Sequence, residues 1–374
     1  MSVKVSDIIR LMNEIAPQNL AENWDNSGLQ IGDKNWSVKS IMVALDPLPD
    51  IVTDACQKNI NLLITHHPLI FKPLSRVDFS TSVGSIIQRS VQNRMALFAA
   101  HTNLDSASGG INDIISEKLG LKDLSVLSEP EQIEKYKLVF YVPVDHEKKL
   151  LEILFQTRAG AIGKYTCCSF RNHGTGTFTP GVSSKPFSGS IGILSQVDEV
   201  RIETVVNRQD LDEVVALLKK HHPYETMAYD SYPLIPEKGN QGLGRVGFLP
   251  RRFRLDQFSD QVRKILNLTS VRVVGDPGLK VEKVAVCSGS GSSLLGNFFA
   301  SGAQVFISGD IRYHDARASE EAGVGIIDVG HFGSEHLVVN VLIQKLRDAI
   351  LTKGMDVSIE ACDLEKDPFV VYSS

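Results

Sequence analysis

Short apolar runs that alternate with helix-like segments recur at both ends of the chain, and they constrain its fold most strongly. In the first 120 residues these runs occur at Ser40 to Leu45, Asn61 to Thr65 and Met95 to Ala100, and residues 281 to 350 repeat the plan. Alternating strands and helices are typical of mostly parallel sheets. We therefore predict an α/β fold with two mostly parallel halves.

The middle of the chain, from about residue 128 to 236, has a different pattern. It contains strand, helix, strand, helix and strand signals in YKLVFYVP, HEKKLLEILFQTR, VRIETVVN, DLDEVVALLKKHH and MAYDSYPL, with a Gly-, Ser- and Thr-rich stretch from Gly174 to Gly192. This order predicts an inserted α+β ferredoxin-like domain at residues 128–236. Residues 1–127 and 237–374 are then the two halves of one composite domain.

Composition excludes several classes of protein. The chain has 374 residues, a hydrophobic share of 43% and a net charge of -5, so we expect a globular protein without the broad positive field that nucleic acid needs. Its amino terminus does not look like a signal peptide, and no apolar run reaches the roughly 18 residues of a membrane span. We expect a cytoplasmic protein with no membrane partner.

The cysteines do not form a metal-binding or disulfide pattern. There are five of them and no CxxC pair, which argues against a disulfide framework and against a thiolate zinc site. Any metal must therefore use nitrogen and oxygen ligands. We expect the adjacent Cys167 and Cys168 to pack inside a strand and assign them no role.

His66 and His67 directly follow the apolar run NLLIT, where an open α/β sheet presents its ligand-binding edge. Neighbouring imidazoles in an extended segment point to opposite sides, so they could serve different ions or hold both flanks of one cluster. The tripeptide HHP recurs at residues 221–223, after a helix-like segment. There we expect a structural role at the helix end, with subunit contact or ligand sensing as the alternative.

Two further strand ends carry polar residues. The run MALFAA precedes His101, with Asp105 four residues later. Asp105 is the better ligand candidate because a carboxylate can bridge two cations, although it could instead cap a helix. His101 could ligate, orient Asp105 or relay a proton. The run GIIDV precedes His331, and Glu335 would lie on the same face of a helix, so this pair could converge on one metal.

Three imidazoles and two carboxylates suit two divalent cations with water between them. We expect zinc, although manganese and iron accept the same kind of shell. Such a pair of ions activates water, which is the chemistry of hydrolysis. The expected ligands are His66, His67, Asp105, His331 and Glu335.

Other polar residues are weaker candidates. The segment Ser288, Gly289, Ser290, Gly291 and Ser292 follows a strand-like run and opens a helix, so its N–H groups could bind an anion, although an ordinary turn explains it equally well. Three residues near the same expected sheet edge could orient the metal ligands or exchange protons, with solvated loop positions as the alternative. These residues are Asp46, Asp310 and His314.

Six motifs occur in order along nearly the whole chain: WDNSGLQIG, THHPLIF, AAHTNLD, GSGSS, SGDIRYHDA and GHFGSEH. They resemble the dinuclear metal-centre family of the YbgI and YqfO type, some members of which are named GTP cyclohydrolase I type 2. The resemblance implies two metal ions on the five residues above and a toroidal homohexamer, a trimer of dimers. It also implies a PII-like or CutA-like insert, and the segment HPYETMAYDSYPL resembles the closing segment of such an insert.

The expected function is that of a dinuclear-metal-dependent hydrolase. In a GTP cyclohydrolase-type reaction, metal-bound hydroxide would attack a nucleotide, which makes a small molecule the expected ligand. The alternative is a metal-binding regulatory or structural assembly whose inserted domain senses a small ligand. An open coordination position would favour the enzyme, and a closed shell would favour the assembly.

Overall fold

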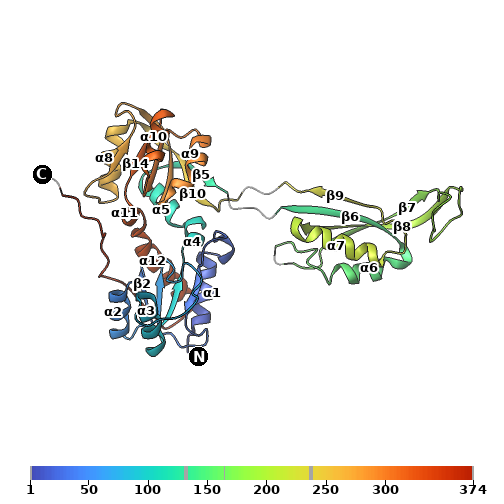
Figure 1. The fold of residues 1–374 in the computed structure, drawn as a ribbon, viewed down its shortest axis with the longest axis horizontal. Coiled ribbons are helices and arrows are strands. Elements are labelled where there is room, and N and C mark those ends of the chain that lie inside the picture. Colours follow the sequence, from blue (N-terminus) through green and yellow to red (C-terminus); the bar gives the residue numbers. More distant parts are fainter. Residues whose placement is uncertain (1, 130–133, 164, 236–238, 373–374) are drawn as a thin grey trace. The chain divides into compact units, whose positions relative to one another are not determined.

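The computed structural model describes residues 2–129, 134–163, 165–235 and 239–372. Its contacts divide the chain into two compact units, which are Met1–Pro130 with Gly239–Ser374, and Glu131–Lys238 (Figure 1). Among the described residues no helix has the length and apolar character needed to cross a membrane.

The first sheet of the larger unit contains five strands in the order β1-β4-β3-β2-β15. Only β1 is antiparallel to its neighbour. The inner strands are buried on both faces, which explains why their sequences are continuous apolar runs. The strands are β1 (Gly28–Ile31), β2 (Ser40–Ala44), β3 (Leu62–Thr65), β4 (Ala96–Ala99) and β15 (Ser358–Ala361). The helices in the same half of the chain are α1 (Val5–Ile15), α2 (Pro49–Gln57), α3 (Ser82–Gln92), α4 (Thr102–Ser106) and α5 (Ile111–Lys118).

The second sheet contains six strands in the order β11-β14-β13-β12-β10-β5. Its centre is parallel as predicted, but antiparallel strands flank it, so the sheet is mixed. The strands are β5 (Lys122–Ser128), β10 (Leu243–Arg254), β11 (Arg272–Val274), β12 (Lys280–Ser290), β13 (Val305–Gly309) and β14 (Gly325–Asp328). The helices of this half of the chain are α8 (Leu255–Ile265), α9 (Leu295–Ser301), α10 (Tyr313–Glu321), α11 (His331–Glu335) and α12 (Leu337–Thr352), and α12 packs against β15 and β2 of the first sheet.

The two halves exchange strands. β5 comes from the first half and pairs with β10 in the second sheet, whereas β15 comes from the end of the chain and pairs with β2 in the first sheet. One hydrophobic core contains Ile41 and Phe98 from the first sheet, Val284 and Ile327 from the second, and Leu342 from α12. The predicted composite α/β domain is therefore confirmed.

The smaller unit has the predicted ferredoxin-like order of elements. Its strands form one antiparallel sheet in the order β7-β8-β6-β9, with one helix after the first strand and one after the third. Val200 and Ile202 of β8 pack in the core under these helices, so Glu199 and Arg201 lie on the opposite face. The elements are β6 (Lys135–Pro143), α6 (Glu147–Leu154), β7 (Ser169–Phe178), β8 (Ser195–Asn207), α7 (Arg208–His221) and β9 (Tyr229–Pro233).

Two smaller expectations for this unit have different outcomes. His222, from the second HHP tripeptide, is buried, and one ring nitrogen hydrogen-bonds the Tyr141 carbonyl while the other accepts from the Tyr224 N–H, so its structural role is confirmed. The prediction that Cys167 and Cys168 pack inside a strand is wrong. Both precede β7, and Cys167 is exposed with a left-handed φ of 58°.

Candidate metal centre

The candidate metal centre lies where the carboxyl ends of strands from both sheets meet. His66 and His67 directly follow β3. Asp105 lies in α4, which begins after β4. His331 and Glu335 are the first and last residues of α11, which follows β14 of the second sheet. Five residues from opposite ends of the chain thus come together within one unit.

The carboxylate of Glu335 is the point on which the histidines converge. Its Oε2 atom lies 2.9 Å from Nε2 of His67 and 2.8 Å from Nε2 of His331. Its Oε1 atom lies 3.6 Å from Nε2 of His66, the same distance that separates this nitrogen from Oδ1 of Asp105. Glu335 is only 3% exposed and His66 is fully buried, so these polar atoms face one another in a site with little water.

The Nδ1 atoms of the histidines are held by oxygen acceptors on the side away from the cluster. Such contacts fix the tautomer and turn Nε2 toward a metal, as is usual for ligating histidines. Asp46 and Asp310, predicted near this edge, are two of these acceptors. The pairs are His66 with the Ala100 carbonyl (2.8 Å), His67 with Asp46 (2.7 Å), His331 with Asp310 (2.7 Å) and His101 with Asp25 (2.8 Å).

The ligand set fits divalent cations. Nε2 of His66 is buried and has no hydrogen-bond partner within the described part of the chain, which is costly unless a ligand occupies it. Two groups have ligand atoms that all lie within 4.8 Å of one another, namely His66, His67 and His101, and His67, His331 and Glu335. Because these groups share His67, the arrangement could hold two neighbouring ions, and it brings His101 in as a further ligand candidate.

Carboxylates strongly perturb the protonation of this cluster. Burial lowers the pKa of His67, but hydrogen bonds to Asp46 and Glu335 outweigh it and raise the pKa to about 10. The hydrogen bond to Glu335 raises the pKa of His331 to about 9. Burial opposes ionisation of Glu335, yet the nearby histidines hold the pKa of this carboxyl well below its usual range. Without cations, the imidazoles of His67 and His331 are therefore protonated at the place where the metals would bind.

Metal uptake is therefore expected to release at least two protons per chain at pH 7, including one each from His67 and His331. Both pKa values lie above 7, so both imidazoles are charged before binding and must be neutral after it. Apparent affinity for zinc should rise at least about a hundredfold per pH unit between pH 6 and 8 and rise less steeply above the pKa values of His67 and His331. Calorimetry in buffers of different ionisation enthalpy measures the released protons. A pH-independent affinity would contradict the prediction.

The segment from Ser288 to Ser292 lies against the cluster. The N–H groups of Ser288, Gly289 and Gly291 donate to side chains of Asn112, Ser334 and Ser308, respectively. These three donors are already used within the protein, and the anion-binding role of the segment stays a prediction.

Gly289 permits the close approach of β12 to Glu335. Its φ is 60°, and a Cβ atom there would lie 2.1 Å from Oε1 of Glu335. Gly289→Ala is therefore expected to displace this carboxylate and weaken zinc affinity at least about tenfold, with a stability loss of roughly 1–3 kcal/mol. Zinc titration and urea unfolding measure the two effects. Gly296→Ala is the control because a Cβ atom at Gly296 meets no atom within 4 Å, and equal affinities in both variants would contradict the expectation.

Asp105 does not cap α5, which was the alternative considered for it. The residue before α5 is Gly110, and the Asp105 side chain instead accepts a hydrogen bond from Ser288 Oγ at 3.3 Å. His314 lies exposed on α10 with its ring against Tyr313. No contact among the described residues joins His314 to the cluster, so its suggested supporting role stays a prediction.

Three supporting residues were not found from the sequence. Asp25 accepts hydrogen bonds from His101, Ser27 and Thr102. Asn112 joins the halves, because it donates to the Asp105 carbonyl and accepts from the Ser288 N–H. Oε1 of Glu365 accepts from the N–H groups of Leu45 and Asp46. For Asp25, the only indication in the sequence is its place in the motif WDNSGLQIG. The sequence around Asn112 and around Glu365 contains no motif that indicates a role for them.

Comparisons with known proteins extend over nearly the whole chain. Residues 3–368 match the family model described as Duf34/NIF3 (NGG1p interacting factor 3). The GTP cyclohydrolase 1 type 2 homolog of Halalkalibacterium halodurans is 37% identical over 97% of each chain. A Bacillus cereus protein related to NIF3 is 37% identical with a TM-score of 0.69 over 100% of both chains. A Staphylococcus aureus protein is 30% identical with a TM-score of 0.76 over 99% of both.

Proposed function

Since this chain belongs to the Duf34/NIF3 family, we propose that it is a two-metal-ion hydrolase that acts on a nucleotide, with GTP as the first candidate. The observation that carries the proposal is the convergence of three imidazole Nε2 atoms on the buried Glu335 carboxylate. The name of the relatives, GTP cyclohydrolase 1 type 2 homolog, suggests the substrate.

We propose that His66, His67, Asp105, His331 and Glu335 hold two divalent cations, with zinc as the expected metal. Bound there, the cations would polarise the substrate and lower the pKa of water, which is the chemistry that hydrolysis needs. The protein orients two of these ligands in advance, because Asp46 hydrogen-bonds the His67 imidazole and Asp310 hydrogen-bonds the His331 imidazole. Burial of the cluster excludes competing water.

We propose that His101 moves protons beside this cluster. Its Nδ1 atom hydrogen-bonds Oδ1 of Asp25 at 2.8 Å, so its Nε2 atom is free to exchange a proton or to ligate a cation. Burial opposes the charge on Asp25, but hydrogen bonds from His101, Thr102 and Ser27 hold the pKa of this carboxyl well below its usual range. Asp25 therefore stays ionised and holds the Nδ1 side of the His101 imidazole in place.

An exposed aromatic pair beside His101 supports a substrate with a planar ring. Trp24 is 57% exposed and Phe71 is 49% exposed, although both are large and apolar. Their ring centroids are 5.8 Å apart, and the Trp24 ring meets the His101 ring edge-on at 6.0 Å. Aromatic surface at this position is suited to stacking a nucleobase.

Trp24→Leu is expected to raise the KM for the nucleotide about tenfold, because stacking of a base on an aromatic ring contributes roughly 1–3 kcal/mol. The kcat should change much less, since the Trp24 ring contacts Phe71 and His101, neither of which belongs to the five proposed metal ligands. Steady-state kinetics measure both constants. The matched control is Trp36→Leu, which alters the hydrophobic core instead; a rise in KM only in that variant would contradict the role of Trp24.

The function is tested by incubating the zinc-loaded protein with a panel of nucleotides and measuring formate and phosphate. Release of formate from GTP would support a cyclohydrolase, and release of phosphate alone would point to a different hydrolase. His67→Ala should abolish either product. A fully metal-loaded protein that releases neither product from any nucleotide would overturn the proposal.

We also propose that the chain forms a homohexamer, a trimer of dimers, as its resemblance to the YbgI and YqfO type implies. Exposed apolar side chains such as Val182, Leu194 and Leu351 support self-association. Light scattering would then give a mass of six 41.1 kDa chains. A monomer at micromolar concentration would contradict this assembly.

A further inference from the structure

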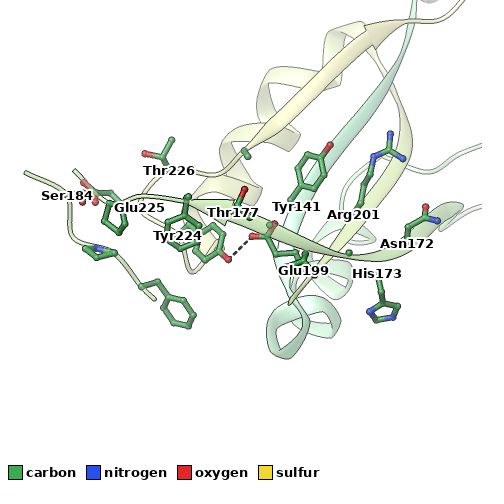
Figure 2. A pocket seen from close by; sticks show the side chains of 18 residues that line it. Tyr141, Asn172, His173, Thr177, Ser184, Glu199, Arg201, Tyr224, Glu225 and Thr226 are labelled. Carbon is green, nitrogen blue, oxygen red and sulfur yellow. Dashed lines mark hydrogen bonds between the residues drawn. The ribbon is translucent and has the colours of Figure 1, made fainter. Parts of the chain in front are cut away.

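The insert contains a cavity of about 510 Å³ that is lined by residues of the insert. Its floor is the face of the sheet opposite the two helices, where Glu199 and Arg201 of β8 lie beside β7 (Figure 2). The segment between β7 and β8 and the segment that follows α7 complete its walls. A volume of this size is typical of small-molecule sites.

The charged groups of the cavity give it an acidic character. Oε1 of Glu199 accepts a hydrogen bond from the Tyr224 hydroxyl at 2.7 Å (Figure 2), and Oε2 of Glu225 accepts from the Lys185 N–H at 2.7 Å. Neither carboxylate has an ion-pair partner within the described ranges. Arg201, which also lines the cavity, is paired with Glu203. A bound cation would therefore meet unneutralised carboxylates.

Aromatic rings form an apolar wall next to these carboxylates. The ring of Tyr224 lies 6.0 Å from that of Phe178 and 6.1 Å from that of Phe187. Burial and the hydrogen bond to Glu199 raise the pKa of Tyr224, so its hydroxyl remains a donor and keeps the carboxylate beside the rings. Aromatic faces attract organic cations and also cover their apolar parts.

Two glycines of β7 make room for a ligand. Gly174 and Glu199 are directly opposite one another in the sheet, and a Cβ atom on Gly174 would meet no atom within 4 Å. A Cβ atom on Gly176 would lie 2.2 Å from Oε2 of Glu199, so this glycine lets the carboxylate pack against the strand. Both glycines line the cavity.

We propose that this cavity binds a small organic cation, an amine with an apolar or aromatic body. Its charged nitrogen lies at Glu199, with Glu225 adding negative charge, and its apolar part lies against Phe178, Phe187 and Tyr224. The carboxylates select for positive charge and the rings select for an apolar body, so neither a metal ion nor a neutral molecule uses the whole site. The insert is then a sensor for an amine.

Three molecules of the same shape test the proposal on the full chain: phenethylamine, 2-phenylethanol and phenylacetate. Ligand-observed NMR and calorimetry at low salt should show millimolar or tighter binding of the amine and much weaker binding of the alcohol and the acid. Glu199→Gln keeps an acceptor for Tyr224 but removes the charge, and it should weaken amine binding roughly tenfold. Gly174→Leu should block the cavity.

Glu213→Gln is the matched control, because Glu213 is exposed on α7 away from the cavity. It should leave amine binding unchanged, and all variants should keep the zinc content of the parent protein. Equal binding of the amine and the alcohol would overturn the proposal, as would unaltered amine binding by Glu199→Gln. Preference for phenylacetate, or failure of phenethylamine to bind at millimolar concentration, would overturn it as well.

Discussion

Replacing His67 with alanine is expected to lower the metal content of the purified protein from about two ions per chain towards one or none, with the fold largely kept. His67 has this effect because it belongs to both groups of converging ligand atoms. Its Nε2 atom lies 2.9 Å from Oε2 of Glu335 and 3.2 Å from Nε2 of His331. Elemental analysis of the dialysed protein measures the stoichiometry.

The chain provides a matched control in its second HHP tripeptide. His221→Ala changes the same residue type in the same local sequence, but at the end of α7 in the other unit. It should leave the metal content unchanged. If His67→Ala and His221→Ala bind equal amounts of zinc, His67 is not a ligand; circular dichroism of both variants shows whether either result reflects loss of fold.

Zinc is expected to stabilise the metal-free protein strongly, and Glu335→Gln should abolish most of this effect. A ligand that binds only the native state adds about 4 kcal/mol at a thousandfold excess over its Kd. Glutamine keeps the size of Glu335 but removes the charge that three imidazoles share, so the variant loses both a ligand and the attraction for cations. Unfolding in urea with zinc and with chelator measures the difference.

A change elsewhere on the surface separates this effect from a general loss of charge. Glu320→Gln removes a carboxylate that is paired with Arg317 on exposed α10, and surface pairs of this kind contribute about 0–1 kcal/mol. Zinc should stabilise this control as much as it stabilises the parent protein. Full zinc stabilisation of Glu335→Gln would show that Glu335 does not bind the metal.

The sequence predicted the ligand-bearing strand ends because fully buried parallel strands leave long apolar runs. β3 and β14 are such strands, and the polar residues that follow them stand out by contrast. Asp25 could not be predicted in the same way. It contacts His101 across 76 positions of sequence, and neither periodicity nor local composition encodes such a contact.

The strand exchange between the halves was also beyond sequence patterns. β5 is exposed along most of its length, and β15 has no buried residue, so neither shows a buried-strand signal. The positions of β5 and β15 in the sheets depend on hydrogen bonds to β10 and β2, and these are contacts between segments that are far apart in the sequence. For the same reason the second sheet contains more antiparallel pairing than the alternation of elements suggested.

The exchanged strands make the two halves of the larger unit depend on each other. The first sheet takes β15 from the second half and the second sheet takes β5 from the first half, so neither half has a complete sheet alone. A chain cut between the halves would leave β2 and β10 without these edge partners, and it would separate His66, His67 and Asp105 from His331 and Glu335.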